Sequence, residues 1–232
     1  MESQYSLTSE EINDLVKIAS RKYRSPIDLN ILIPLLNMVY DTLEQHKRIL
    51  AIRTDPRFAL SHVPGEPDLP LCFQRDDTQA ITRFFDSLKS QLRADHNRSI
   101  RPGNPTFPSY GWCRERDTSA HSHYHLMLLF NADVYGYLGN YQELNTKNMA
   151  IRIQKAWCSS IGLDHEDYST LAEFPPNAVY RFSRFDALDR NPVYWRFLIR
   201  LAYLAKTRTK DVHSGYRNFG ISQCPRLGGL AC

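Results

Sequence analysis

Residues 110–130 read YGWCRERDTSAHSHYHLMLLF. This stretch contains two runs, 110–117 and 121–130, that are rich in aromatic and apolar residues and lie only a few residues apart. Such a pair of runs predicts two adjacent antiparallel strands, a β-hairpin. The hairpin indicates that the sheet is antiparallel, and we expect the other elements of the chain to pack around it.

Helices and strands are also expected on either side of the hairpin, from apolar periodicity and from capping signals. The predicted helices are one that begins with a capping box at residues 8–11 (TSEE) and those over 27–45, 76–92, 145–162 and 191–210; the further predicted strands are 48–54, 178–183 and 218–222. Asn145 and Asn191 are the expected N-caps of the last two helices, and Gly162 is the expected end of the first of these. This order of elements predicts an α+β domain in which helices pack on an antiparallel sheet.

The composition is that of an ordinary globular chain. It has 232 residues, 42% hydrophobic content and a formal net charge of +4, which fits one large domain or one domain with an added subdomain. The five cysteines are odd in number and form no C-x-x-C pair, so we expect reduced thiols and neither a disulfide framework nor a cysteine zinc site. There is no signal-peptide pattern and no apolar run near the roughly 20 residues that span a bilayer. We therefore expect a cytoplasmic protein without membrane contact.

Three histidines at every second position mark the second strand of the hairpin. Because side chains two apart on a strand point to the same side, His121, His123 and His125 share one face. Imidazole is the commonest metal ligand among side chains. If the hairpin register places Glu115 beside them, it completes a site of two histidines and one carboxylate, which suits Mn²⁺ or Mg²⁺. The alternatives are a solvent-facing strand that binds nothing and, for Glu115, a surface ion pair with an arginine.

Tyr203 lies in a basic part of the chain. Residues 181–226 contain ten Lys and Arg against three acidic residues, so this segment carries +7 while the whole chain carries +4. On the predicted helix Tyr203 points away from the apolar stripe, among basic residues. A tyrosine can attack phosphorus when a metal polarises the phosphate and cations favour the phenolate; a half-buried packing tyrosine on a solvated helix side is the alternative.

Concentrated positive charge favours binding to a phosphate backbone. The residues that we expect to contact DNA are Arg181, Arg196, Arg200, Arg208 and Lys210.

Together these motifs resemble those of the HUH endonucleases, which initiate rolling-circle replication. The strand carries HYH (123–125) and the helix carries YLAK (203–206). More narrowly, the chain is similar to the inovirus-type replication proteins of filamentous phages and bacterial prophages, in the stretches RILAIRTD (48–55), W-x-R-E (112–115), VYRFSR (179–184), YLAKTRTK (203–210) and GYRNFG (215–220). The resemblance implies a ferredoxin- or RRM-like antiparallel sheet of about five strands, a nuclease domain over 45–232 and an N-terminal helical extension over 1–44.

The resemblance also implies a site and a mechanism. His123, His125 and Glu115 hold a divalent metal, Mn²⁺ or Mg²⁺, which polarises a scissile phosphate of single-stranded DNA or of a hairpin origin. Tyr203 attacks the phosphorus and becomes joined to the 5′ phosphate, leaving a free 3′ hydroxyl. Lys206 places the phosphate or stabilises charge in the transition state. Because the covalent bond conserves the phosphodiester energy, the same site can rejoin strands.

Two features depart from the family pattern. Many phage-type initiators use two active-site tyrosines, whereas here Tyr194, nine residues before Tyr203, lies on the packing side of the helix. This puts a two-tyrosine cycle in doubt, though not single nicking. His121 is extra, and is either a bystander or an additional metal ligand.

Two other functions stay open. One is a non-catalytic prophage DNA-binding regulator on an inherited nuclease fold, which needs the basic residues but no metal. The other is a metal phosphoesterase for small molecules, which the concentrated basic charge disfavours. No helicase signature such as G-x-x-x-x-G-K-[ST] occurs in the sequence, so DNA unwinding would come from a host helicase as partner.

Overall fold

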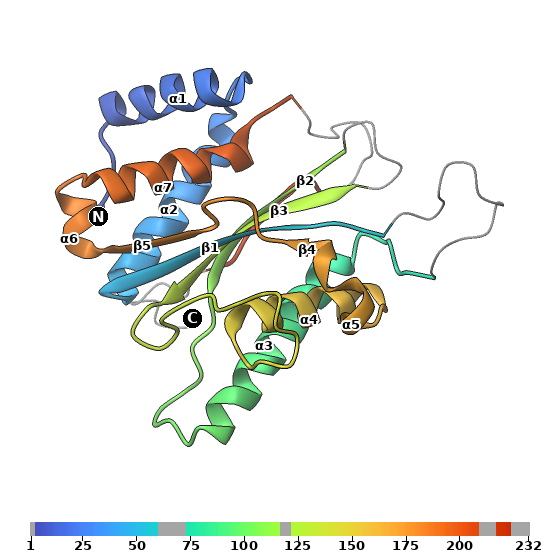
Figure 1. Cartoon of the computed structure of the whole chain (residues 1–232). Helices are drawn as coiled ribbons and strands as arrows, with labels where there is room; N and C mark the ends of the chain where they lie inside the picture. The colour runs from blue at the N-terminus through green and yellow to red at the C-terminus, as the bar shows by residue number, and fades with distance from the viewer. Residues whose placement is uncertain (1–2, 60–72, 117–121, 209–216, 224–232) are drawn as a thin grey trace, which may run out of the picture.

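The computed structural model describes residues 3–59, 73–116, 122–208 and 217–223. Within these segments the chain forms an α+β fold with a six-stranded sheet, which confirms the predicted class (Figure 1). The strands are β1 (Arg48–Pro56), β2 (Ser109–Glu115), β3 (His123–Asn131), β4 (Ala172–Glu173), β5 (Val179–Ser183) and β6 (Phe219–Ile221). Their order is β4-β1-β3-β2-β6, β5 also pairs with β1, and all pairs are antiparallel.

The predicted hairpin is confirmed and lies near the middle of the sheet. β2 pairs with β3 in a register that sets Glu115 opposite His123 and Cys113 opposite His125. β1, the apolar run predicted as a strand, pairs with the other side of β3. The short strand β6 pairs with the edge of β2 that faces away from β3, which confirms the strand predicted over residues 218–222.

Helices cover both faces of the sheet, which places a core on each side (Figure 1). The helices on one side are α2 (Leu29–Gln45) and α7 (Pro192–Ala202), with α1 (Ser9–Tyr23) against α7; those on the other side are α3 (Ala80–Arg98) and α4 (Met149–Ile161). Because strand side chains alternate, Met127 and Leu129 enter the core under α2 and α7, whereas Leu126 and Leu128 enter the core under α3 and α4.

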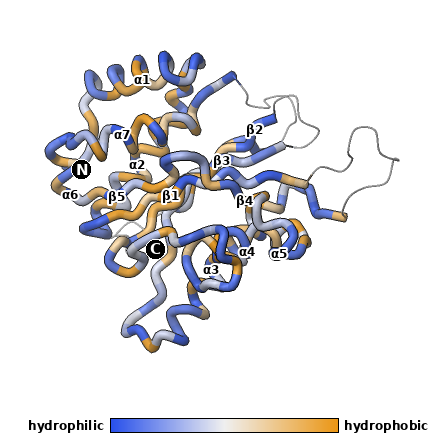
Figure 2. The backbone as a smooth tube through the Cα atoms, in the orientation of Figure 1, coloured by the Kyte–Doolittle hydropathy of each residue, from blue (hydrophilic) through white to orange (hydrophobic). Residues whose placement is uncertain are grey.

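Local signals explain where several helices begin. Thr8 and Glu11 form the predicted capping box of α1. Hydrophobic and hydrophilic residues alternate along α1 (Figure 2), as expected for a helix that packs on one side. Asn191 caps α7, Pro192 occupies its first turn, and Gly162 ends α4 with a left-handed backbone.

Three predicted helices have wrong boundaries. The helix predicted over residues 76–92 is α3, which begins at Ala80 and ends at Arg98. The N-cap of α4 is Asn148, whose side chain accepts a hydrogen bond from the Ile151 N–H, and not Asn145. Residues 143–146 instead form a turn, in which the Thr146 N–H donates to the carbonyl of Glu143. The sequence offers both asparagines, and the turn decides between them.

The last predicted helix, 191–210, is too long. α7 ends at Ala202 and continues as a 3₁₀ turn, Tyr203–Ala205. The chain leaves the helix because its backbone there pairs with the segment before α2: the Asp28 N–H donates to the Ala205 carbonyl, and the Thr207 N–H donates to that of Pro26. This long-range pairing could not be seen in the local sequence.

Four shorter elements were not predicted: α5 (His165–Tyr168), the 3₁₀ turn Ser169–Leu171, β4, and α6 (Arg184–Leu188). The expected N-terminal helices are present, and α2 contributes Leu32, Leu35 and Leu36 to the same core as the sheet. The expected domain boundary at residue 45 stays a prediction. None of the helices in the described segments has both the length and the apolarity that crossing a bilayer requires.

The packing of α2 on the sheet can be tested at Leu35, which is fully buried against Gly111 of β2. We expect Leu35→Ala to lower the free energy of unfolding by about 2–5 kcal/mol, because it leaves a cavity in the core. Leu29→Ala, in the same helix but 50% exposed, is the control and should cost under about 1 kcal/mol. Urea denaturation followed by circular dichroism measures both, and equal losses would contradict the packing.

Candidate metal and tyrosine site

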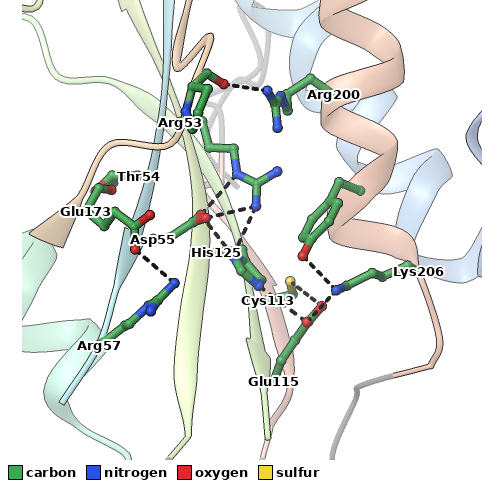
Figure 3. Close-up of polar contacts among 12 residues, drawn as sticks. Arg53, Thr54, Asp55, Arg57, Cys113, Glu115, His125, Glu173, Arg200 and Lys206 are labelled. Atoms are coloured by element: carbon green, nitrogen blue, oxygen red, sulfur yellow. Dashed lines mark hydrogen bonds and ion pairs between the residues drawn. The ribbon is translucent and has the colours of Figure 1, made fainter. Parts of the chain in front are cut away.

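A polar cluster lies on the α7 side of the sheet, where β1 and β2 end and β3 begins. Alternation places Arg53 and Asp55 of β1, His123 and His125 of β3, and Glu115 of β2 on this one face. Figure 3 shows Arg53, Asp55, His125 and Glu115 converging from the three strands. Further along the same strands this face is apolar, so the cluster occupies one end of a core.

Glu115, His123 and His125 each offer a ligand atom, and these atoms all lie within 4.8 Å of one another. The predicted hairpin register is therefore confirmed, and these three residues could hold a metal ion. His125 Nε2 is buried and makes no hydrogen bond to any described residue, although Glu115 Oε2 lies 3.3 Å away. An imidazole nitrogen that faces a carboxylate without a hydrogen bond is suited to donate its lone pair to a cation.

Asp55 orients His125 from the other side of the ring. Its Oδ1 lies 2.8 Å from His125 Nδ1, and Arg53 Nη2 lies 3.1 Å from the same nitrogen. Because an ionised carboxylate only accepts hydrogen bonds, the shorter contact favours the tautomer with the proton on Nδ1 and the lone pair on Nε2. Burial alone would raise the pKa of Asp55, but His125 and then Arg53 lower it to about 2. Asp55 is thus a carboxylate at all ordinary pH values and fixes the tautomer that a metal ligand needs.

His123 is also held in the form that binds metals. Burial, and the neighbouring His125 ring at 4.9 Å between centroids, lower the pKa of His123 to about 4. The imidazole is therefore neutral near pH 7, with a nitrogen available as a ligand.

Tyr203 and Lys206 reach the cluster from the 3₁₀ turn after α7. The Lys206 ammonium donates to the Tyr203 hydroxyl at 2.7 Å and forms an ion pair with Glu115 Oε2 at 2.9 Å. The phenol oxygen thus lies within two hydrogen-bond lengths of the carboxylate. The Tyr203 ring also packs edge-on against His125, with centroids 5.0 Å apart. The predicted nucleophile and the predicted metal ligands therefore belong to one site.

Lys206 is a cation that pairs with Glu115 in this structure. Lys206 is only 8% exposed. Burial lowers its pKa, but the hydrogen bonds and charges of Tyr203 and Glu115 raise the pKa by more than burial lowers it, so the net shift is upward. A divalent ion bound to Glu115 would have to share this carboxylate with the ammonium.

The residues predicted to contact DNA do not form one surface. Arg196 and Arg208 are exposed, whereas Arg200 donates to the Pro176 carbonyl and the Tyr180 hydroxyl. Arg181 is exposed on β5 opposite Leu50, whose side chain enters the core under α3 and α4, so Arg181 lies on the other face of the sheet from α7. Lys210, like the additional candidate ligand His121, lies outside the described residues.

Three residues of the site were missed in the sequence. Arg53 and Asp55 had a signal, because two charged residues at alternate positions of an otherwise apolar strand indicate a polar patch on one face. Tyr23, at the end of α1, had none; its ring packs edge-on against Tyr203 at 5.0 Å, and its hydroxyl donates to the Ile199 carbonyl. Burial raises the pKa of Tyr23 to about 12.

The fold and the cluster define an α+β protein with an antiparallel sheet that could hold a metal at one end, beside a tyrosine and a lysine. The chain belongs to the YagK/YfjJ C-terminal domain family, which matches residues 8–222. It is 33% identical over 197 residues to YfjJ, an uncharacterized protein of Escherichia coli K12, covering 80% of this chain and 90% of YfjJ. It is 34% identical over 183 residues to the uncharacterized YagK of the same organism, covering 77% of this chain and 85% of YagK. No solved structure matches.

The competition for Glu115 gives a prediction. Lys206→Met removes a positive charge while keeping a side chain of similar length, so Mn²⁺ should bind about tenfold more tightly or better. Isothermal titration with MnCl₂ measures this. Lys155→Met, an exposed position on α4, is the control and should leave the affinity unchanged. Unchanged or weaker binding by Lys206→Met would show that Lys206 and the ion do not share the carboxylate.

The low pKa of His123 predicts a pH dependence of stability. The unfolded chain, with an ordinary histidine pKa of 6.5, binds more protons than the folded chain between pH 6.5 and about 4. The free energy of unfolding should therefore rise as the pH rises through this window. Urea denaturation in EDTA at several pH values should show a smaller rise for His123→Gln than for the wild type. Equal rises would mean that His123 titrates normally in the folded protein.

Proposed function

We propose that the protein is a metal-dependent nuclease of the HUH type, which nicks and rejoins single-stranded DNA through a 5′-phosphotyrosine intermediate, as in rolling-circle replication initiation. The observation that supports this most is the single ammonium of Lys206, which contacts both the Tyr203 hydroxyl and Glu115. A strand with two histidines alone would suit many metal sites. A tyrosine hydroxyl beside those ligands suits phosphoryl transfer to the protein.

Each residue has a distinct role in this proposal. His123, His125 and Glu115 would hold Mn²⁺ or Mg²⁺, which supplies Lewis-acid polarisation of a phosphate oxygen. Asp55 keeps the lone pair of His125 on the side of the site. The Tyr203 oxygen forms the new bond to phosphorus, and the bond from phosphorus to the 3′ oxygen breaks.

The protons in this reaction can also be assigned. Lys206 donates a hydrogen bond to the tyrosine oxygen, and its ammonium can stabilise negative charge that develops in the transition state. The Tyr203 proton is lost to solvent, and the departing 3′ oxygen takes a proton from solvent, which leaves a free 3′ hydroxyl. Attack of that hydroxyl on the phosphotyrosine reverses these changes and rejoins the strand.

Single-stranded DNA, or a hairpin in an origin, is the proposed substrate. The exposed Arg196 and Arg208 flank the turn that carries Tyr203 along the chain, and they are suited to contact the phosphate backbone. We place this activity in the cytoplasm of a bacterial host of a phage or prophage, with a host helicase as partner.

A non-catalytic DNA-binding regulator is the second candidate. The observation in its favour is that the buried charges already balance: Asp55 pairs with Arg53, and Glu115 pairs with Lys206. Such a network can be stable without an ion. The two candidates differ in one property, since the nuclease requires Mn²⁺ binding at Glu115, His123 and His125 and the regulator does not.

The nuclease is tested by incubating the protein with Mn²⁺ and a labelled pool of random single-stranded oligonucleotides. We expect a covalent protein–DNA adduct that survives denaturing electrophoresis, and at least a hundredfold less adduct with Tyr203→Phe, because the nucleophilic oxygen is gone. Tyr141→Phe, an exposed tyrosine on the other side of the sheet, should react like the wild type. An adduct formed at full yield by Tyr203→Phe rules out this nucleophile. If the protein binds DNA but forms no adduct and binds no Mn²⁺, the result favours the regulator.

A further inference from the structure

The guanidinium of Arg53 lies inside the candidate site, yet the reaction described above gives it no role. Arg53 lies on β1 and is only 2% exposed. Its Nε and Nη2 donate to the two carboxylate oxygens of Asp55, both at 3.0 Å. This two-point contact fixes the plane of the guanidinium and occupies the donors on one side of it.

The guanidinium of Arg53 packs against the ring of Tyr203, the predicted nucleophile. Nη1 is buried and makes no hydrogen bond to any residue in the described segments. The guanidinium carbon lies 4.0 Å from the centre of the Tyr203 ring. A buried donor without an acceptor costs free energy, and native structures rarely keep one without a reason. Because arginine is always charged, this nitrogen places a positive donor beside the tyrosine and leaves it available.

We propose that Arg53 is a catalytic residue for the strand transfer: Nη1 donates a hydrogen bond to the negatively charged oxygen that forms where Tyr203 attacks a phosphodiester. This proposal rests on the proposed function and adds an anion-stabilising residue to it. The Tyr203 oxygen gains its bond to phosphorus as the bond to the 3′ oxygen breaks. Arg53 keeps all its protons and only contributes charge and a hydrogen bond. Donors fixed in advance toward developing charge are among the strongest contributions to catalysis.

The alternative is that Arg53 serves only as the counterion of Asp55. The two roles predict different effects, because Asp55 acts on the metal side through His125, whereas Nη1 acts on the tyrosine side. A counterion role would change metal affinity and DNA transfer together. A catalytic role would slow transfer while the metal site stays intact.

The test compares Arg53→Gln with the wild type and with Arg48→Gln. Arg48 is a matched control, because it lies at the other end of the same strand, β1, and its ion pair with Asp133 lies at the surface. Mn²⁺ affinity is measured by isothermal titration, adduct formation by single-turnover kinetics with the random oligonucleotide pool, and folding by urea denaturation. For Arg53→Gln we expect adduct formation to slow by about a hundredfold, with Mn²⁺ affinity unchanged. Arg48→Gln should match the wild type in both.

Arg53→Lys is a second variant, which is used if Arg53→Gln does not fold. A lysine keeps the charge but cannot bind both Asp55 oxygens and also present a third fixed donor, so we expect adduct formation to slow by about tenfold. Wild-type rates in either variant, or a loss of Mn²⁺ affinity that parallels the loss of rate, would overturn the role of Arg53. A wild-type protein that forms no adduct with Mn²⁺ would instead overturn the proposed function itself.

Discussion

The contact of the Lys206 ammonium with Tyr203 and Glu115 is the interaction on which the site depends. It joins the turn after α7 to the hairpin, two parts of the chain that are far apart in sequence. The turn exists because α7 stops at Ala202 and the chain then pairs with the segment before α2. The 3₁₀ turn Tyr203–Ala205 and Lys206 after it therefore lie where both side chains reach the hairpin.

The sheet holds this contact by burying charged side chains, which costs free energy. Arg53, Asp55, Glu115 and His125 are all buried on a face that is apolar further along the strands. Buried charges are costly unless each has a partner, and here Arg53 pairs with Asp55 while Lys206 pairs with Glu115. An apolar end to this core would be simpler to stabilise. The chain keeps four charges there, and Arg53 Nη1 and His125 Nε2 make no hydrogen bond to any of the residues that the structure describes. This is the physical reason for assigning a function to this end of the sheet.

Much of the fold could be predicted from the sequence because its signals are local. Alternation gave the central strands and the face that His123 and His125 share, and the hairpin explained how Glu115 reaches them. What escaped prediction depends on contacts between distant segments. The choice of Asn148 over Asn145 depends on a turn, the end of α7 depends on the pairing near Pro26, and Tyr23 reaches the site only because α1 packs against α7. The HUH resemblance goes beyond what the family assignment establishes and stays a proposal.

The central claim is that Glu115, His123 and His125 hold one metal ion next to the Tyr203 hydroxyl. The most direct measurement is a crystal structure of the protein grown with MnCl₂, with anomalous scattering used to locate manganese. The account predicts one strong anomalous peak bonded to these three side chains, with the tyrosine oxygen facing it and Lys206 moved away from Glu115. A site that stays empty of manganese, with the ammonium still paired to the carboxylate, would contradict it.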